Sequence, residues 1–136
     1  PYPNAKVTRG SSPDWLETIV RGEGLTLYWL DAHWDVAGAA KMAYAPDPVP
    51  LRAECRIVSR LPRYIALIDD FYCENPHFEG DQFAPGLRND LSYVADLLGP
   101  RCWRPDYEAK AGYKGYGLFL RDVDYTPPAT MKLEEL

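Results

Sequence analysis

Four side chains in this sequence could act together chemically: Asp31, His33, Asp69 and Asp70. Each acid comes directly after, or one residue after, a short apolar run, and His33 lies two residues beyond Asp31. Carboxylate oxygens suit a hard cation such as Mg²⁺, with Mn²⁺ or Ca²⁺ as further options. A neutral imidazole beside that cation could remove the proton of a substrate hydroxyl. These residue types predict a divalent-cation site at Asp31, Asp69 and Asp70, with His33 as the general base.

Each of these residues also has a structural interpretation. Adjacent strand residues face opposite sides, so Asp69 and Asp70 converge only if the backbone turns, and one of them could instead cap that turn. His33 could be a hydrogen-bonded structural histidine. His77, in a loop after the second apolar run, is expected at the surface. Glu54 faces either solvent or the crevice, and both options stay open.

Two apolar runs must position the acids. Residues 25–30 and 64–68 lack polar alternation, which is typical of strands buried on both faces of a parallel sheet. In open α/β sheets, ligands bind in the crevice outside the carboxyl ends of the strands. We therefore expect two neighbouring strands that bring the acids to one crevice. Trp29 and Trp34 would line that crevice or pack in the core.

The remaining elements follow from helical spacing and from Gly and Pro punctuation. The alternation of strands and helices predicts an α/β fold that ends in an antiparallel hairpin. Long connections after the two acidic strands are expected to border the crevice. The expected ranges are a weak strand at 5–9, helices at 13–21, 51–61 and 87–98, terminal strands at 101–108 and 115–121, and long loops at 38–50 and 73–85.

Length and charge limit the class of protein. At 136 residues the chain is one domain or part of one, and its net charge of −5, without a Lys/Arg run, argues against nucleic-acid binding. No apolar run approaches the roughly 20 residues that cross a bilayer. The cysteines, Cys55, Cys73 and Cys102, have no close metal-binding or redox spacing. We expect reduced, partly buried thiols in a cytoplasmic protein.

The order of three motifs resembles the later part of a class I S-adenosylmethionine-dependent methyltransferase. These motifs are residues 4–12 (NAKVTRGSS), 30–34 (LDAHW) and 67–71 (LIDDF). The nearest branch is the metal-dependent sugar O-methyltransferases of antibiotic pathways and their uncharacterised relatives. The resemblance covers roughly residues 4–121. It implies a Rossmann-like three-layer sandwich that contains strands 3 to 7 of a sheet ordered 3-2-1-4-5-7-6.

The resemblance also implies a division of the chain and a role for each acid. Residues 1–121 would be the C-terminal part of the methyltransferase domain, and residues 122–136 a tail. In the family, an aspartate after the fourth strand and an acidic pair after the fifth hold a divalent cation, positions that Asp31 and Asp69-Asp70 match. His33 matches the base. The implied reaction is methyl transfer from S-adenosylmethionine to a hydroxyl of a small molecule or sugar.

The sequence departs from this family in one respect. The glycine-rich loop and the acidic residue that hold the cofactor, on the first two strands, are not found in it. We therefore expect a longer protein, a partner chain or a second copy to supply those strands, because otherwise the strand at 25–30 exposes an apolar edge. The chain alone should bind S-adenosylmethionine no better than about millimolar, about −4 kcal/mol.

Two other functions fit parts of the pattern. A methyltransferase remnant could serve as a non-catalytic interaction or assembly subunit. A haloacid-dehalogenase-like phosphatase also has an aspartate after one apolar strand and an acidic pair after a later one. That family's first motif, however, has a second aspartate at the position of His33 and a threonine or valine near Asp35. No convincing lysine motif lies between the two acidic strands.

Overall fold

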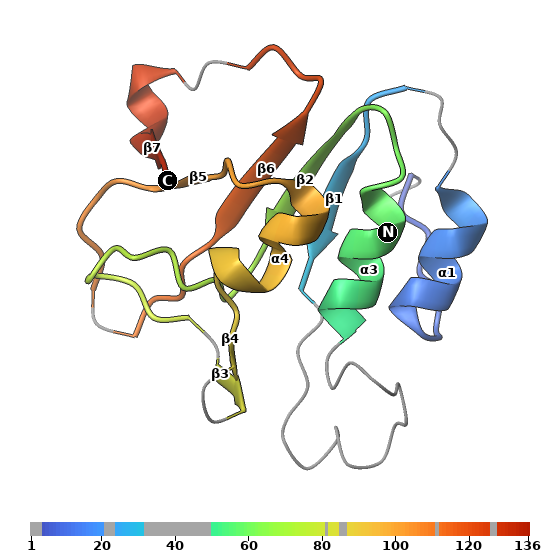
Figure 1. Ribbon diagram of the computed structural model, residues 1–136, viewed down its shortest axis with the longest axis horizontal. Coiled ribbons are helices and arrows are strands. Elements are labelled where there is room, and N and C mark those ends of the chain that lie inside the picture. The colour runs from blue at the N-terminus through green and yellow to red at the C-terminus, as the bar shows by residue number, and fades with distance from the viewer. Residues whose placement is uncertain are drawn as a thin grey trace.

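The computed structural model describes residues 4–20, 24–31, 50–80, 82–84, 87–110, 112–125 and 128–136. These residues form an α/β fold around one open, mixed, five-stranded sheet (Figure 1). In spatial order the strands are β1 (Leu27–Leu30), β2 (Tyr64–Ile68), β6 (Gly117–Arg121), β5 (Trp103–Pro105) and β7 (Leu133–Glu135). β1 and β2 are parallel, whereas the β2–β6, β6–β5 and β5–β7 pairs are antiparallel.

Three α-helices accompany the sheet in the described part of the chain. They are α1 (Ser12–Ile19), α3 (Pro50–Val58) and α4 (Leu91–Leu98). The remaining elements are a short hairpin, formed by β3 (Gln82–Ala84) and β4 (Leu87–Arg88), and a 3₁₀ turn, η1 (Ala129–Met131). Asp90 begins α4 because its carboxylate accepts the Tyr93 N–H. No helix among these residues is both long and apolar enough to span a bilayer.

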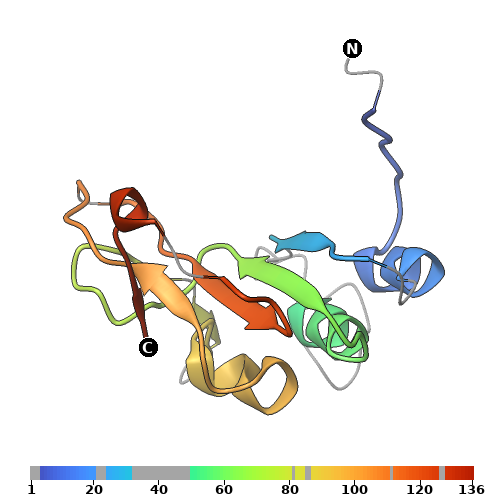
Figure 2. The ribbon, with the colours of Figure 1, turned by 90° about the horizontal axis from the view of Figure 1, so that it is seen from above.

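One face of the sheet carries the hydrophobic core. Ala66, Ile68 and Phe119 point to this face and are fully buried. Helices α3 and α4 lie on this side of the sheet (Figure 2). The Phe119 ring meets the Phe71 ring edge to face, with 5.9 Å between centroids. Arg52 of α3 forms a two-pronged ion pair with Asp96 of α4 at 2.7 and 3.0 Å, which joins the two helices.

The opposite face of the sheet is also apolar. Strand register places its side chains in two rows, one that crosses from β1 to β6 and one that crosses from β1 to β5. On β1 these side chains are exposed, and on β2, β6 and β5 they are half-buried. This surface, called the open face below, consists of Leu27, Ile65 and Leu120 in one row and Trp29, Leu67, Leu118 and Trp103 in the other.

The prediction that residues 25–30 are buried on both faces is therefore wrong. In β1, Tyr28 and Leu30 are buried, but Leu27 and Trp29 are 59% and 64% exposed. The reason is tertiary: β1 is an edge strand of the described sheet, and α3 and α4 pack on one side only. Trp29 accordingly does not lie in the core, and its expected place in the carboxyl-end crevice stays a prediction.

The prediction of a weak strand at residues 5–9 is also wrong. This segment forms no strand, and Val7 is 96% exposed. It extends away from the sheet (Figure 2). A strand needs a hydrogen-bonding neighbour, and no described strand lies beside this segment. At the other end of the chain, part of the expected tail joins the sheet, because β7 pairs with β5.

Other predictions from the sequence are confirmed. Residues 64–68 form β2, the terminal strands form an antiparallel pair, and Gly99, with φ +98°, ends α4. All three cysteines are buried and unpaired. Burial raises the pKa of the Cys55 thiol and raises that of Cys102 to about 12, so both thiols favour their neutral, unreactive form.

Candidate functional site

The strands β1 and β2 end side by side. Leu30 pairs with Ile68 in parallel register, and the Asp69 N–H donates to the Leu30 carbonyl at 3.1 Å. Asp31 and Asp69 therefore follow neighbouring strands, which lie about 4.8 Å apart. The expectation that two neighbouring parallel strands deliver acids to one edge of the sheet is confirmed. Asp31 is exposed, whereas Asp69 and Asp70 are half-buried.

The backbone turns sharply after β2. Asp70 has φ +52°, a left-handed conformation in which an L residue is uncommon. One carboxylate oxygen of Asp69 accepts the Asp70 N–H at 2.9 Å. This is the capping role that the sequence left open for one acid of the pair. The turn required for Asp69 and Asp70 to converge is thus present, and one oxygen of Asp69 helps to form it.

The Asn89 side chain, which lies outside β2, stabilises this acidic turn. Its side-chain amide donates to the Asp69 carbonyl at 2.9 Å and to the Asp70 carbonyl at 3.1 Å. The side chain is 3% exposed, so water does not readily replace these bonds. Sequence reasoning missed Asn89 because it placed the residue inside a helix. The adjacent Asn89-Asp90 pair, typical of a helix N-cap, was the signal for a later helix start.

Glu54 is a buried residue of α3. It is 2% exposed, and its Oε2 atom has no hydrogen-bond partner. Burial raises the pKa of this carboxyl, a hydrogen bond with the Ser12 side chain lowers it, and the negative charge of Asp31 raises it again. The net shift is upward. The open question from the sequence is therefore answered: Glu54 is directed inward, close enough to Asp31 to be affected by its charge.

The acids do not form a ready multidentate metal cage. Within the described ranges, no group of three or more His, Cys, Asp or Glu side chains is arranged to hold a metal ion. Mg²⁺, however, is commonly held by one or two carboxylates, with water completing its shell. Asp31 and the Asp69-Asp70 turn supply oxygen donors of that kind. The prediction of one ion shared by all three acids stays a prediction.

Other sequence candidates fall elsewhere. His33, Trp34 and Asp35 lie outside the described residues, as do residues 38–49 of the loop expected at 38–50, whereas Pro50 begins α3. The base role of His33 therefore stays a prediction. His77 is an exposed loop residue, as expected.

The segment after β2 closes against the beginning of β6. A backbone hydrogen bond joins Gly115 to Glu79: the Gly115 N–H donates to the Glu79 carbonyl at 2.8 Å. The Phe71 N–H donates to the Gly115 carbonyl at 2.9 Å. A Cβ at Gly115 would lie 2.5 Å from the Phe71 carbonyl oxygen, so only glycine fits there. Residues 73–80 of the expected loop at 73–85 thus leave from the carboxyl edge of the sheet and pack beside it, whereas residues 82–84 form β3 and not loop.

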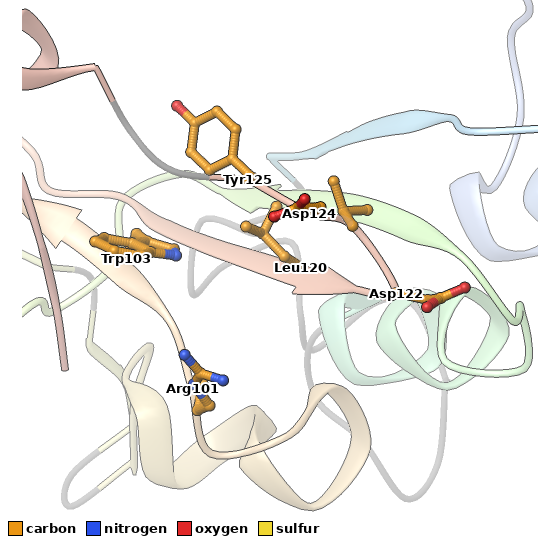
Figure 3. A pocket seen from close by; sticks show the side chains of 7 residues that line it. Arg101, Trp103, Leu120, Asp122, Asp124 and Tyr125 are labelled. Carbon is orange, nitrogen blue, oxygen red and sulfur yellow. The ribbon is translucent and has the colours of Figure 1, made fainter.

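A separate pocket lies near the opposite end of the sheet. It has a volume of about 330 Å³, and register places it beside the beginning of β2, because Leu120 pairs with Ile65. Figure 3 shows Trp103 and Leu120 on its strands, and Asp124 and Tyr125 on the segment after β6. Its lining residues are Arg101, Trp103, Leu120, Asp122, Val123, Asp124 and Tyr125. Sequence reasoning did not find this pocket, because its residues come from two separate segments, 101–103 and 120–125.

Comparisons of this chain with protein-family models, with curated proteins and with solved structures found no match. Its own residues and their arrangement therefore carry the functional argument.

Proposed function

We propose that this chain forms the hydroxyl-methylating part of an S-adenosylmethionine-dependent methyltransferase. The strand order is the observation that supports this proposal most directly. From one edge, the sheet runs β1-β2-β6-β5, with a parallel first pair and an antiparallel last pair. If β1 is the fourth strand of the family's 3-2-1-4-5-7-6 order, this run has the order 4-5-7-6. The acidic motifs then follow the fourth and fifth strands, as the resemblance implies.

The proposal gives each acidic residue a task. Asp31 and the Asp69-Asp70 turn would hold a hard divalent cation such as Mg²⁺, and Asn89 would keep that turn in place. A bound cation polarises a hydroxyl oxygen and makes its proton easier to remove. His33 is proposed as the base that takes this proton.

The proposal leaves the cofactor to other residues. None of the described side chains is assigned to S-adenosylmethionine. The outer edge of β1 has no strand partner within the described part of the chain. We therefore propose that the cofactor-binding strands lie beside β1 and come from a longer protein, a partner chain or a second copy.

A methyl-transfer assay tests this proposal. The product of the complete reading frame is incubated with methyl-labelled S-adenosylmethionine and a panel of sugars and small hydroxyl compounds, with Mg²⁺ or with EDTA. We expect transfer that EDTA abolishes and that Asp69→Asn reduces at least about 100-fold, in line with the removal of a metal ligand or its support. Asp106→Asn, at an exposed position directly after β5 and separated from β2 by β6, is the matched control and should keep full activity.

The same assay separates the alternatives. Binding of S-adenosylmethionine without transfer to any acceptor would favour a non-catalytic interaction subunit. Release of phosphate from p-nitrophenyl phosphate would favour the phosphatase. Transfer that is unchanged by EDTA and by Asp69→Asn would contradict the proposed cation site while leaving methyl transfer in place.

A further inference from the structure

Tyr72 and Arg88 form a cation–π pair next to the acidic turn at Asp69-Asp70. The Arg88 guanidinium carbon lies over the Tyr72 ring, 4.9 Å from its centroid. Both residues are exposed at the surface. Among the described residues no carboxylate pairs with Arg88, so its N–H groups remain available to a ligand.

Backbone contacts hold this pair beside the acidic turn. The Tyr72 N–H donates to the Asn89 carbonyl at 2.6 Å, and Tyr72 forms a β-bridge with Asp90. Arg88 directly precedes Asn89, whose side chain binds both carbonyls of the turn. A Cβ at Gly80 would lie 2.3 Å from the Tyr72 nitrogen, so only glycine allows this close packing. The backbone that carries the pair is therefore fixed relative to the turn.

The pair also lies at the edge of the sheet where ligands of α/β folds bind. Figure 1 shows the β3–β4 hairpin, which carries Arg88, beyond the carboxyl ends of β1 and β2. In a three-layer sandwich, helices cover the two faces of the sheet, whereas the crevice outside the carboxyl ends stays open to ligands. The exposure of this pair therefore does not depend on which layers cover the open face.

The charges around the pair leave Arg88 as a cation that a ligand can reach. Asp90 caps α4. Glu79 and Lys114, which form a β-bridge, add one charge of each sign. Under the proposed function, the acidic turn holds a cation that offsets its charge. Asp81 lies outside the described residues.

We propose that Arg88, supported by Tyr72, binds the anionic group of the hydroxyl acceptor, so that the acceptor is a sugar that carries a phosphate or a carboxylate. This inference rests on the proposed function, because it places the acceptor beside the acidic turn. The planar guanidinium presents a fork of N–H donors that matches two oxygens of one oxyanion. The Tyr72 ring supports the guanidinium from one side.

The chemistry of Arg88 selects an anionic acceptor over the other classes. A cationic acceptor would meet a charge of the same sign, and a neutral sugar would gain no charge-assisted hydrogen bond. The net charge of −5 on the whole chain has little influence at this site, since exposed charges farther apart than about 8 Å are largely screened at physiological ionic strength.

Calorimetry with three sugar probes tests the proposal. The product of the complete reading frame, with Mg²⁺ present, is titrated with glucose 6-phosphate, with glucuronate and with methyl glucoside. We expect at least one charged probe to bind at least 10-fold more tightly than the neutral one, in line with charge-assisted hydrogen bonds. Tighter binding of glucose 6-phosphate than of glucuronate assigns a phosphate, and the reverse assigns a carboxylate.

Matched variants locate the anion at Arg88. Arg88→Gln removes the charge at an exposed position and should lower the preference for the charged probe at least about fivefold. Tyr72→Leu should lower it about threefold, because the guanidinium loses the ring that supports it. Arg63→Gln, at an exposed position directly before β2 and so at the other end of that strand, should keep the full preference. Circular dichroism checks that each variant is folded.

Several results would overturn the proposal. Charged probes that bind no better than methyl glucoside, or binding of no probe, would do so with the unaltered chain alone. An unchanged preference in Arg88→Gln would also do so. Methyl transfer to neutral acceptors only would overturn the Arg88 site and leave the proposed function in place. Binding that depends on Arg88, without transfer to any acceptor, would support the oxyanion site and contradict the proposed reaction.

Discussion

The two faces of the sheet carry similar side chains in opposite environments. On the covered face Ile68 and Phe119 are fully buried, whereas on the open face Leu27 and Trp29 are largely exposed. Both faces are apolar, so hydrophobicity alone does not explain the difference. The difference arises because α3 and α4 pack against one side. The composition of a strand therefore predicts that its side chains favour apolar contacts, but it does not predict whether helices cover one face of the sheet or both.

The largest contrast is expected between Phe119 and its neighbour Leu118 on β6. Phe119→Ala removes a fully buried ring and should lower the free energy of unfolding by about 3–5 kcal/mol. Leu118→Ala, on the half-buried open face, should lower it by about 1 kcal/mol. Urea denaturation measures both values. Equal losses would mean that the open face is as well covered as the other.

A smaller loss is expected at the acidic turn. Asn89→Ala leaves the Asp69 and Asp70 carbonyls without this donor in a buried place, which should cost about 1–3 kcal/mol. Asn75→Ala is the matched control, because Asn75 also donates to two carbonyls but is only half-buried, so water can replace it. Denaturation should show the greater loss for Asn89. A greater loss at Asn75 would contradict the burial argument.

Glu54 tests how burial on the covered side of the sheet affects an ionisable group. Because burial raises its pKa in the folded state above 4.5, the folded chain binds the proton more tightly than the unfolded chain. Its contribution to stability is present at low pH and is lost as pH rises from about 4.5 through the folded pKa. Glu54→Gln stays neutral and avoids this loss.

Glu54→Gln should therefore gain stability relative to the unaltered chain as pH rises through that window. Urea denaturation at a series of pH values from about 4 to about 8 measures the difference. Glu108→Gln, at an exposed position, controls for the loss of one negative charge. A difference that does not change with pH would mean that Glu54 is not held in a desolvating environment.

The smallest effect is expected on the open face itself. Leu27→Ser should change the free energy of unfolding by no more than about 0.5 kcal/mol, because the side chain is mostly in water already. Tyr28→Ser, one residue further on and buried, should cost several times more. The same denaturation experiment compares them. A large loss at Leu27 would show that the open face contributes to folding of the isolated chain.

The sequence by itself determined the elements whose signals are local. The apolar run at 64–68 forms β2, and the Gly99-Pro100 pair ends α4, because strand propensity and helix termination depend on neighbouring residues. It also determined that acids follow β1 and β2, since a carboxylate directly after an apolar run is visible without any tertiary contact.

Only the tertiary structure decided what depends on distant partners. Residues 5–9 form no strand because no neighbouring strand pairs with them, while residues 133–135 do form one because β5 is available. Asn89 supports the acidic turn and Glu54 is buried, both through contacts across the chain. Alternation along a strand assigns side chains to two faces, but the packing of helices chooses which face is covered.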